Sequence, residues 1–252
     1  MNKIFRLLRA LRLLVPFLRA LWLLLPRKNW WYFIQTSEVA GFKNAFSISW
    51  SQGGEDLALL HAIAGKKDGL FIDVGAHHPF RFSVTQHLSR LGWRGVNIDA
   101  NSKLIEIFNK ERKRDINICA AVGTEKSYTF TIFKEPALSS VNSEWKDKFQ
   151  ADGWEVDRTV TVPGISLREI YNQNFPVACI DLLSIDAEGS DFDVLKSMDF
   201  ESLEKGRFPR FLLLEATPPV TSALKTDSVE YAIGLGYVPL YVLPMSTLLQ
   251  RG

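Results

Sequence analysis

From Ser51 onward the chain alternates between short apolar runs and stretches with helical spacing, and this alternation limits the folds available to it. An apolar run over Leu70–Val74 is followed by FSVTQHLSRLGW, whose apolar side chains share one helical face. GVNIDAN, SKLIEIFNKERKR and DINICAAVG continue the series as strand, helix and strand. Such a β-α-β-α-β series is the unit of a doubly wound parallel sheet. The sequence therefore predicts an α/β fold, with a lead-in helix over residues 51–65 that Ser51 would cap.

The second half of the chain returns to this alternation after a less regular middle. Residues 124–178 predict a strand (SYTFTIF), a loop with a short helix (EPALSSVNSEWKDKF), and a strand and helix that Pro163 and Gly164 separate. ACIDLLSID, DFDVLKSM and RFLLLEA follow as strand, helix and strand, and then come a helix over residues 227–235 and two strands, YVPLYVL and STLLQ. With 252 residues and 46% hydrophobic content, the chain can bury one sizeable core. We expect one domain over residues 51–250, after a linker over residues 36–50.

The first 35 residues are rich in leucine, arginine and tryptophan, and contain no acidic residue. On a helical projection Arg6, Arg9, Arg12 and Arg19 fall within an arc of about 140°. The opposite side carries Leu7, Leu11, Leu14, Phe17, Leu18, Leu21 and Trp22. Residues 1–35 are therefore predicted to form a basic amphipathic helix.

The placement of this helix has several alternatives. An arginine near the bilayer centre costs about 2.5 to 3.5 kcal/mol on insertion scales, which disfavours a transmembrane span. A secretory signal would keep its positive charges ahead of an uninterrupted apolar core, whereas here arginines lie between the leucines, which disfavours a signal. The helix could also pack on the domain or on a dimer partner. An in-plane anchor fits best, with leucines in the acyl boundary and arginines at anionic headgroups, so we expect a peripheral position on the inner face of the membrane.

Charge and cysteine content narrow the classes of partner and compartment. The net charge of +2 gives no whole-molecule field that favours nucleic acid, and we expect no such partner. Cys119 and Cys179 lie in apolar, strand-like runs and resemble neither a disulfide framework nor a zinc site. A reducing cytoplasm is the simpler interpretation.

Four predicted strands end in or next to an acidic residue: Asp73, Asp99, Asp186 and Glu215. In an open parallel sheet, ligands bind in the crevice at the carboxyl ends of the strands. Gly75 follows the first of these acids and lets the backbone approach a ligand closely. Asp99 ends the next strand, where a carboxylate can accept both hydroxyls of a ribose. The pattern predicts a nucleoside cofactor.

The residues after Gly75 narrow the choice of nucleoside. A dinucleotide fold requires G-x-G-x-x-G, whose second glycine makes room for a pyrophosphate, and this chain has AHHPF there. NAD and FAD are therefore disfavoured, and with them a nucleotide-linked oxidoreductase. S-adenosylmethionine, which has a ribose and no phosphate, is compatible with the loop.

Five segments together carry a family resemblance. They are SQGGED at 51–56, FIDVGAHHPFRFSVT at 71–85, GWRGVNIDAN at 92–101, EPALSS at 135–140 and LLSIDAEGSDFDVLKS at 182–197. In their order and separations they resemble the FkbM family of S-adenosylmethionine-dependent methyltransferases. The resemblance spans residues 50–250 and implies a Rossmann-like methyltransferase fold, a mostly parallel seven-stranded sheet with an antiparallel C-terminal hairpin, here preceded by the N-terminal helix. It also implies O-methyl transfer, often to sugar hydroxyls.

The resemblance assigns cofactor contacts to matching positions. Asp73 and Gly75 would line the methionine part of S-adenosylmethionine, and Asp99 would bind the ribose. Ala120 and Ala121 would lie on the adenine side. Departures from the family pattern fall elsewhere, at position 84 and in the tail after position 237, so they concern the acceptor rather than the cofactor.

Asp186, Glu188 and Gly189 match the D-x-E-G signature of the family. During methyl transfer the positive charge of the sulfonium disperses while the acceptor hydroxyl loses a proton. A carboxylate at this strand end can orient the cofactor or accept that proton. Asp186 and Glu188 are therefore the candidate catalytic residues, and Asp186 is also a candidate cofactor contact. Ser190 and Asp193, three residues apart, predict a capping box for the next helix.

Other polar residues near the predicted strand ends have two interpretations each. His77 and His78 could act as bases or metal ligands, or they could shape a loop through a bond between one ring and the backbone. Gln52, Glu55 and Asp56 could reach the amino group of the cofactor or the acceptor, or they could decorate an exposed helix start, where acids favour the helix dipole.

The candidates on the acceptor side are also divided. Arg81 could steer an acidic acceptor or lie on the surface. Trp145, Phe149 and Trp154 could form a sugar-stacking lid or pack against the sheet edge. A metal-dependent mechanism needs oxygen ligands from adjacent loops, and LLLEATPP offers Glu215 without an Asp-Asn pair, so we expect no metal site.

Two functions of different classes follow from these patterns. The first is an S-adenosylmethionine-dependent O-methyltransferase that acts on a hydroxyl, in a glycan or a lipid-linked saccharide. The alternative is a non-catalytic, membrane-associated adaptor that retains the fold. The intact acids favour the enzyme, and calorimetry with S-adenosylhomocysteine separates the two functions because an adaptor should bind none.

Overall fold

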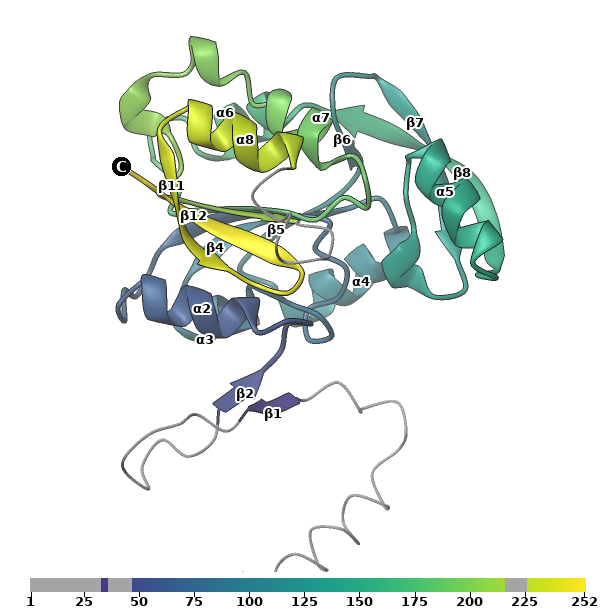
Figure 1. Cartoon of the computed structure of the whole chain (residues 1–252), viewed down its shortest axis with the longest axis horizontal. Helices are drawn as coiled ribbons and strands as arrows, with labels where there is room; N and C mark the ends of the chain where they lie inside the picture. The colour runs from purple at the N-terminus through teal and green to yellow at the C-terminus, as the bar shows by residue number, and fades with distance from the viewer. Residues whose placement is uncertain (1–32, 36–46, 216–225) are drawn as a thin grey trace, which may run out of the picture.

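A seven-stranded sheet forms the centre of the molecule in the computed structural model, which describes residues 33–35, 47–215 and 226–252 (Figure 1). The strands lie in the order β11 (Tyr237–Val242), β12 (Ser246–Arg251), β10 (Phe211–Glu215), β9 (Leu182–Ile185), β3 (Leu70–Val74), β4 (Arg94–Asp99) and β5 (Ile116–Cys119). From β10 to β5 all neighbouring strands are parallel, whereas β12 is antiparallel to both β10 and β11. The predicted mostly parallel sheet with an antiparallel C-terminal hairpin is therefore confirmed.

Helices cover both faces of this sheet (Figure 1). One face carries α2 (Glu55–Ala62), α3 (Gln86–Arg90) and α4 (Ser102–Glu111). The other carries α6 (Leu167–Asn174), α7 (Asp191–Lys196) and α8 (Asp227–Gly234), and the short 3-10 helices η4 (Phe200–Ser202) and η5 (Lys205–Arg207) connect α7 to β10. Because both faces are covered, the central strands β3, β9 and β10 are mostly apolar and buried on both sides.

Local hydrogen bonds explain where several helices begin. The Asn101 side chain accepts from the Lys103 amide at 3.2 Å and caps α4, and Ser166 forms a capping box with Glu169 at α6. Two predicted caps were wrong. Helix α2 begins after Gly54 rather than Ser51, and the Ser190 side chain makes no capping bond to α7 within the described structure. At α7 the carboxylate of Asp191 instead accepts a backbone N–H from the preceding turn.

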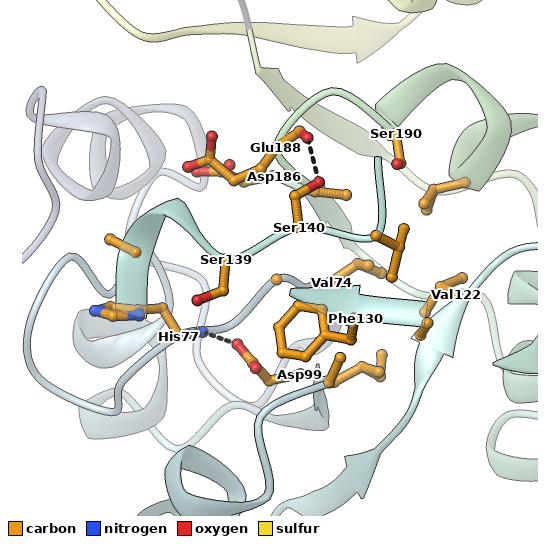
Figure 2. Close-up of a pocket in the computed structure, with 18 of the residues that line it drawn as sticks. Val74, His77, Asp99, Val122, Phe130, Ser139, Ser140, Asp186, Glu188 and Ser190 are labelled. Atoms are coloured by element: carbon orange, nitrogen blue, oxygen red, sulfur yellow. Dashed lines mark hydrogen bonds between the residues drawn. The ribbon is translucent and has the colours of Figure 1, made fainter. Parts of the chain in front are cut away.

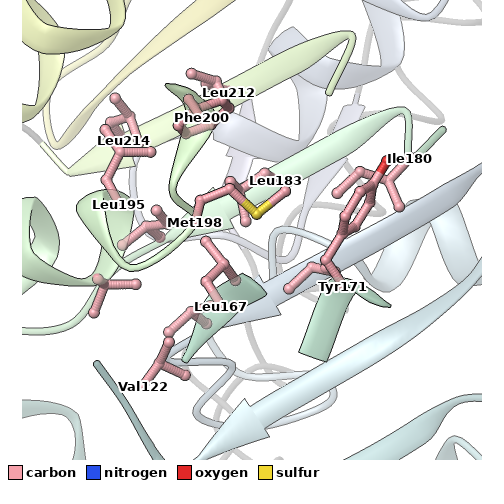
Figure 3. Packing of buried hydrophobic residues seen from close by; sticks show 14 of the residues in the cluster. Val122, Leu167, Tyr171, Ile180, Leu183, Leu195, Met198, Phe200, Leu212 and Leu214 are labelled. Carbon is pink, nitrogen blue, oxygen red and sulfur yellow. The ribbon is translucent and has the colours of Figure 1, made fainter. Parts of the chain in front are cut away.

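Alternate residues of the central strands supply two hydrophobic clusters. Phe71 and Leu182 point to the face that α2 and α3 cover, and Ile72 and Leu183 point to the face of α6, α7 and α8. On the second face, Leu183 lies among side chains from β10, α6, α7 and η4 (Figure 3). Complete burial of one such side chain is worth about 1.5 to 3 kcal/mol, so these clusters hold the strand ends in register.

A smaller, three-stranded sheet projects beyond β5 (Figure 1). Its order is β6 (Ala121–Val122), β8 (Val156–Ile165) and β7 (Ser127–Phe133), and the chain between β7 and β8 forms η3 (Pro136–Leu138) and α5 (Ser143–Ala151). The prediction that Pro163 and Gly164 end the strand was wrong, because both lie inside β8. Pro163 pairs with β7 and Gly164 with β6, so the proline stands where β8 changes partner. A Cβ at Gly164 would lie 2.0 Å from the Glu125 carbonyl oxygen, so only glycine fits this crossing.

Before the domain, β1 (Phe33–Gln35) pairs antiparallel with β2 (Ser47–Ser49). Strand therefore occupies the last residues of the predicted amphipathic helix and part of the predicted linker, because backbone pairing between these two segments replaces helical bonds. The remainder of that helix, residues 1–32, lies outside the described residues. Within the described ranges, no helix combines the length and the apolar character that crossing a bilayer requires.

Candidate active site

The strand order reverses between β3 and β9, and a pocket opens at this point. From β3 the chain proceeds to β4 and β5 on one side, and later to β9 and β10 on the other. The crevice outside the carboxyl ends of such strands is where ligands of doubly wound sheets bind. A pocket lies there, lined in part by residues from the ends of these strands (Figure 2).

The pocket gathers most of the residues that the sequence predicted for a site. Its lining includes Gly75, Asp99, Ala120, Ala121, Asp186 and Glu188. In Figure 2 the carboxyl groups of Asp186 and Glu188 lie at one side of the pocket and that of Asp99 lies at another. These residues come from the ends of β3, β4 and β9 and from the start of β6, which explains how positions more than a hundred residues apart share one hollow.

The side of the pocket next to the smaller sheet is apolar. Ile98 from β4, Val122 from β6 and Phe130 from β7 line it together with the two alanines, Ala120 and Ala121. The small alanine side chains and the Phe130 ring leave space for a flat apolar group. Sequence reasoning missed Phe130, because SYTFTIF gave only the period of a strand and no indication that its partner strands reach the main sheet.

Asp99 carries the acceptor groups nearest to this apolar wall. Its carboxylate accepts the backbone N–H of His77 at 3.0 Å (Figure 2) and that of Asn101 at 2.7 Å. Burial raises the pKa of Asp99 to about 7, against the lowering effect of these two bonds. A carboxylate has about four lone-pair directions, so two remain for donors from a ligand.

Gly75 lies where the ends of β3 and β9 approach each other. Its φ is +74°, and a Cβ at this position would lie 1.6 Å from the backbone oxygen of Asp186. The Asp186 amide donates to the Val74 carbonyl at 3.1 Å, which holds the two strand ends together. A glycine at this position is therefore required for the approach of the D-x-E-G segment to β3.

Asp73, which the resemblance would place with Gly75 against the methionine part of the cofactor, is not among the residues that line this pocket. Val74 lines the pocket, and successive strand residues point to opposite faces, so the Asp73 side chain points away. Its carboxylate, 3% exposed, accepts the Thr85 hydroxyl at 3.0 Å. Burial raises the pKa of Asp73 to about 6, so this carboxyl is held beneath the site rather than inside it.

The carboxyl groups at the ends of β9 and β10 form a cluster, in which Asp191 is buried, Glu188 and Glu215 are half-buried and Asp186 is exposed. Burial raises the pKa of Asp186 well above its usual range, and the charges of Glu188 and Asp191 raise it further. Burial raises the pKa of Glu188 to about 7. Burial, followed by the charges of Asp186 and Asp191, raises the pKa of Glu215 to about 11. Such shifts arise where carboxyls share a dry site, and they are typical of groups that handle protons.

Two hydrogen bonds from the segment between β7 and β8, here called the inserted unit, hold the turn that carries Glu188. Glu188 has a φ of +46° and Gly189 a φ of +87°, so two successive residues are left-handed. The Ser140 hydroxyl donates to the Glu188 carbonyl at 2.8 Å (Figure 2), and the Asn142 side-chain amide donates to the Gly189 carbonyl at 2.8 Å. Sequence reasoning matched EPALSS to the family but gave Ser140 and Asn142 no role.

The two histidines of the AHHPF loop differ in environment. His77 lines the pocket, its Nδ1 is buried without a hydrogen-bond partner in the described structure, and burial lowers its pKa to about 3. The ring is therefore neutral at physiological pH. His78 Nδ1 accepts the backbone N–H groups of Phe80 and Arg81, both at 3.1 Å, which is the loop-shaping alternative.

The polar residues at the start of α2 also differ in environment. The Asp56 carboxylate accepts the Ser49 hydroxyl, the Trp50 amide and the Ser51 hydroxyl, so it stabilises the backbone before the helix. Gln52 lines the pocket. Glu55 is 3% exposed, and its Oε1 is buried without a hydrogen-bond partner among the described residues.

The remaining candidates concern charge and metal binding. Arg81 forms an ion pair of 2.7 Å with Glu135, at the start of the inserted loop. Among the residues that the structure describes, no group of at least three His, Cys, Asp or Glu side chains is arranged to hold a metal ion.

Comparisons with known proteins give one family match for this chain. A family model of the methyltransferase FkbM domain matches residues 73–222, more than half of the chain. No curated protein sequence matches the chain.

Similar solved structures have low sequence identity. The methyltransferase FkbM from Methylobacillus flagellatus is 12% identical with a TM-score of 0.43, over 72% of this chain and 43% of that chain, so the match spans less than half of its length. Precorrin-6Y C5,15-methyltransferase from Geobacter metallireducens is 12% identical with a TM-score of 0.43, over 86% and 94% of the two chains. TrmK from M. capricolum, in complex with S-adenosylhomocysteine, is 13% identical with a TM-score of 0.37, over 77% and 68%.

Proposed function

The chain belongs to the FkbM family of S-adenosylmethionine-dependent methyltransferases, and we propose that it methylates a hydroxyl of a saccharide, in a glycan or a lipid-linked saccharide. The observation that carries this proposal is the pair of carboxyls, Asp186 and Glu188, in the same pocket as Asp99. In this proposal Asp99 binds the ribose of the nucleoside, and Asp186 and Glu188 lie next to the acceptor hydroxyl that loses its proton.

The pocket fits S-adenosylmethionine by its chemistry. Ala120, Ala121 and Phe130 would contact the adenine, and the two unused acceptor directions of Asp99 would bind the ribose hydroxyls. The unpartnered Nδ1 of His77 supports a ligand with a hydrogen-bonding group at this edge of the pocket. When the cofactor is bound it supplies a methyl group on a sulfonium, whose carbon–sulfur electron pair stays with sulfur on transfer.

Glu188 and Asp186 divide the remaining work in this proposal. Glu188 would accept the proton that the acceptor hydroxyl loses on methylation, because its pKa of about 7 suits a general base. Asp186, which lines the same pocket, would favour the positive charge of a bound sulfonium. Gly75 and Gly189 set the backbone path that presents both side chains.

The substitution Glu188→Gln tests the role of the base. We expect transfer to fall by about 10² to 10⁴, the usual contribution of general base catalysis. The affinity for S-adenosylhomocysteine, measured by calorimetry, should stay close to that of the wild type. Unchanged turnover in the variant would refute the base role.

The acceptor itself can be found by mass spectrometry. Glycans and lipid-linked saccharides from cells that lack the gene should be lighter than those from parent cells by one CH₂ group at the methylated position. Complementation with the wild type should restore the mass, and complementation with Glu188→Gln should not. Identical spectra in both kinds of cell would argue against a saccharide acceptor.

We also propose that residues 1–35 bind an anionic membrane surface and that residues 51–250 form the methyltransferase domain. Support comes from the arginines at 6, 9, 12 and 19 opposite an apolar face, a pattern typical of helices that lie in the interface. Full-length protein should sediment with vesicles that contain phosphatidylglycerol, and protein without residues 1–35 should not. Equal sedimentation of both proteins would contradict this assignment.

A further inference from the structure

The ring of His77 has one hydrogen-bond partner among the described residues, the guanidinium group of Arg81. Arg81 Nη1 lies 3.3 Å from His77 Nε2. An arginine side chain carries only donors, so Nε2 must accept this bond and cannot carry a hydrogen itself. Burial, followed by the charge of Arg81, lowers the pKa of His77 to about 3, so the ring is neutral and has a single N–H group. That hydrogen is therefore on Nδ1.

Further contacts hold Arg81 and the ring in one arrangement. Arg81 Nη1 also donates to Glu135 Oε1 at 2.7 Å, which joins the AHHPF loop to the inserted unit. The guanidinium carbon lies 4.3 Å from the centre of the Phe82 ring. The Phe82 ring in turn stacks on the His77 ring, with 5.9 Å between the ring centroids and an interplanar angle of 25°. The same contacts therefore maintain the tautomer of His77.

The Nδ1–H group of His77 is a donor that the described chain leaves unpaired. His77 lines the active-site pocket, and its Nδ1 is buried without a partner among the described residues. A buried polar group without a hydrogen bond costs about 1 to 3 kcal/mol. His77 also has a φ of +52°, and such left-handed residues concentrate at ligand sites. A ligand that brings an acceptor atom to Nδ1 would recover the cost of the unpaired donor.

Asp99 indicates which part of a ligand lies near this donor. The backbone N–H of His77 donates to Asp99 Oδ2 at 3.0 Å, so the histidine lies directly against the carboxylate proposed to bind the ribose (Figure 2). A hydroxyl group has one hydrogen to donate and two lone pairs that accept. A ribose hydroxyl can therefore donate to Asp99 and accept from His77 at the same time.

We propose that His77, in the tautomer that Arg81 sets, donates from Nδ1 to a ribose hydroxyl of the cofactor. His77 then selects ribose over deoxyribose, because a deoxy sugar leaves the donor unpaired, and Arg81 is the positioning residue that acts through it. The inference holds for any methyl acceptor. It rests on one part of the proposed function, the placement of the ribose at Asp99.

Calorimetry on the full-length protein with S-adenosylhomocysteine and its 2′-deoxy and 3′-deoxy analogues measures this contact. One of the two analogues should bind the wild type about tenfold more weakly than S-adenosylhomocysteine. In His77→Leu this preference for ribose should shrink by about fivefold, the effect of one neutral hydrogen bond. His77→Asn should keep most of it, because its amide can donate and asparagine tolerates a left-handed φ. Each preference is a ratio within one protein, so a general loss of folding cancels.

Nitrogen NMR of protein labelled at histidine tests the tautomer directly. Wild-type His77 should carry its hydrogen on Nδ1, and Arg81→Met should change the tautomer ratio and lower the preference for ribose. Arg158→Met is the matched control, because Arg158 pairs with Asp157 at 2.7 Å and lies outside the pocket lining. A hydrogen on Nε2 in the wild type, or the same preference for ribose in the wild type and His77→Leu, would overturn the proposal.

The variant Asp99→Asn separates this inference from the placement of the cofactor. It removes the charge that strengthens the bonds to the ribose hydroxyls, so the preference for ribose should fall. An unchanged preference in Asp99→Asn would show that the ribose does not lie at Asp99, which refutes the proposed cofactor placement. A lower preference in Asp99→Asn with an unchanged one in His77→Leu would overturn the role of His77 alone.

Discussion

Ser140 and Glu188 are 48 residues apart in the chain, yet the Ser140 hydroxyl donates a 2.8 Å hydrogen bond to the Glu188 carbonyl. Glu188 has a φ of +46°, a conformation that costs a non-glycine residue of the order of 1 to 3 kcal/mol. Such a conformation persists where the surroundings over-determine it. The bond from Ser140, with that from Asn142 to Gly189, shows that the inserted unit helps to hold the turn that presents the proposed base.

The first prediction separates the two roles of Asn142. Its side chain caps α5 through the oxygen and holds Gly189 through the nitrogen. Asn142→Ser keeps a capping oxygen and removes the donor, whereas Asn142→Ala removes both. We expect kcat to fall in both variants, with a further loss of about 1 kcal/mol in unfolding free energy only for the alanine variant. Wild-type kcat in Asn142→Ser would show that the bond to Gly189 does not position Glu188.

The second prediction concerns the contact between Gly189 and Trp145. Gly189→Ala adds a Cβ at 1.6 Å from the indole, at a φ of +87°. Gly153→Ala is the matched control, because Gly153 has a φ of +89° and no atom within 4 Å of an added Cβ. We expect urea denaturation to show a loss of about 1 to 2 kcal/mol for the control and about 1 to 3 kcal/mol more for Gly189→Ala.

Combining Gly189→Ala with Trp145→Ala checks the cause of that difference. Removal of the ring should bring the cost of the alanine at 189 close to that at 153. If the two single glycine variants lose the same stability, the indole does not restrict position 189.

The sequence indicated the main sheet well because its central strands are recognisable from their own apolar residues. Leu70–Val74 and the run that ends before Asp186 are mostly apolar on both faces, which is typical of strands in a covered parallel sheet. The smaller sheet was harder to predict, because Pro163 and Gly164 look like a strand end and their true partners are set by a crossing between β6 and β7. Pairing between distant segments has no local signature.

The same distinction applies to the site. Gly75, Asp99 and Asp186 lie at strand ends, so topology alone brings them to one pocket. The Asp73 side chain bonds to Thr85 because of the face of β3 on which it lies. Its position two residues before Gly75 gave no indication of that face. Ser140 contributes through one hydrogen bond from a loop, and its position follows from the packing of the inserted unit rather than from any period in the sequence.

The third prediction is a dependence of stability on pH. Burial raises the pKa of Asp73 to about 6, above its usual value of 3.8, so the folded state binds the proton more tightly. Its contribution to stability is therefore fully present below about pH 4 and is lost as the pH rises through about 6. Asp73→Asn cannot ionise, and the Thr85 hydroxyl can bond to an amide as well as to a carboxylate.

Urea denaturation at pH 5 and pH 8 measures this effect. The difference in unfolding free energy between the two pH values should be smaller in Asp73→Asn, and at pH 8 the variant should be more stable by about 1 to 3 kcal/mol. Asp193→Asn, at an exposed position of α7, should follow the wild type. A variant whose stability falls with pH as steeply as the wild type would show that the Asp73 carboxyl does not titrate in this range.

The last prediction is the pH dependence of turnover. Burial raises the pKa of Glu188 to about 7, and a general base is active only when it is ionised. kcat/KM for S-adenosylmethionine, which reports the free enzyme, should therefore rise with pH and level off above an apparent pKa near 7. The profile of kcat should be displaced to lower pH, because a bound sulfonium favours the ionised carboxylate.

Lys148→Met removes the cation that lowers the pKa of Glu188, so its kcat/KM profile should move to higher pH, whereas Lys146→Met should leave it in place. A profile that is flat between pH 5 and pH 9, or the same for both lysine variants, would contradict Glu188 as the base under the influence of Lys148.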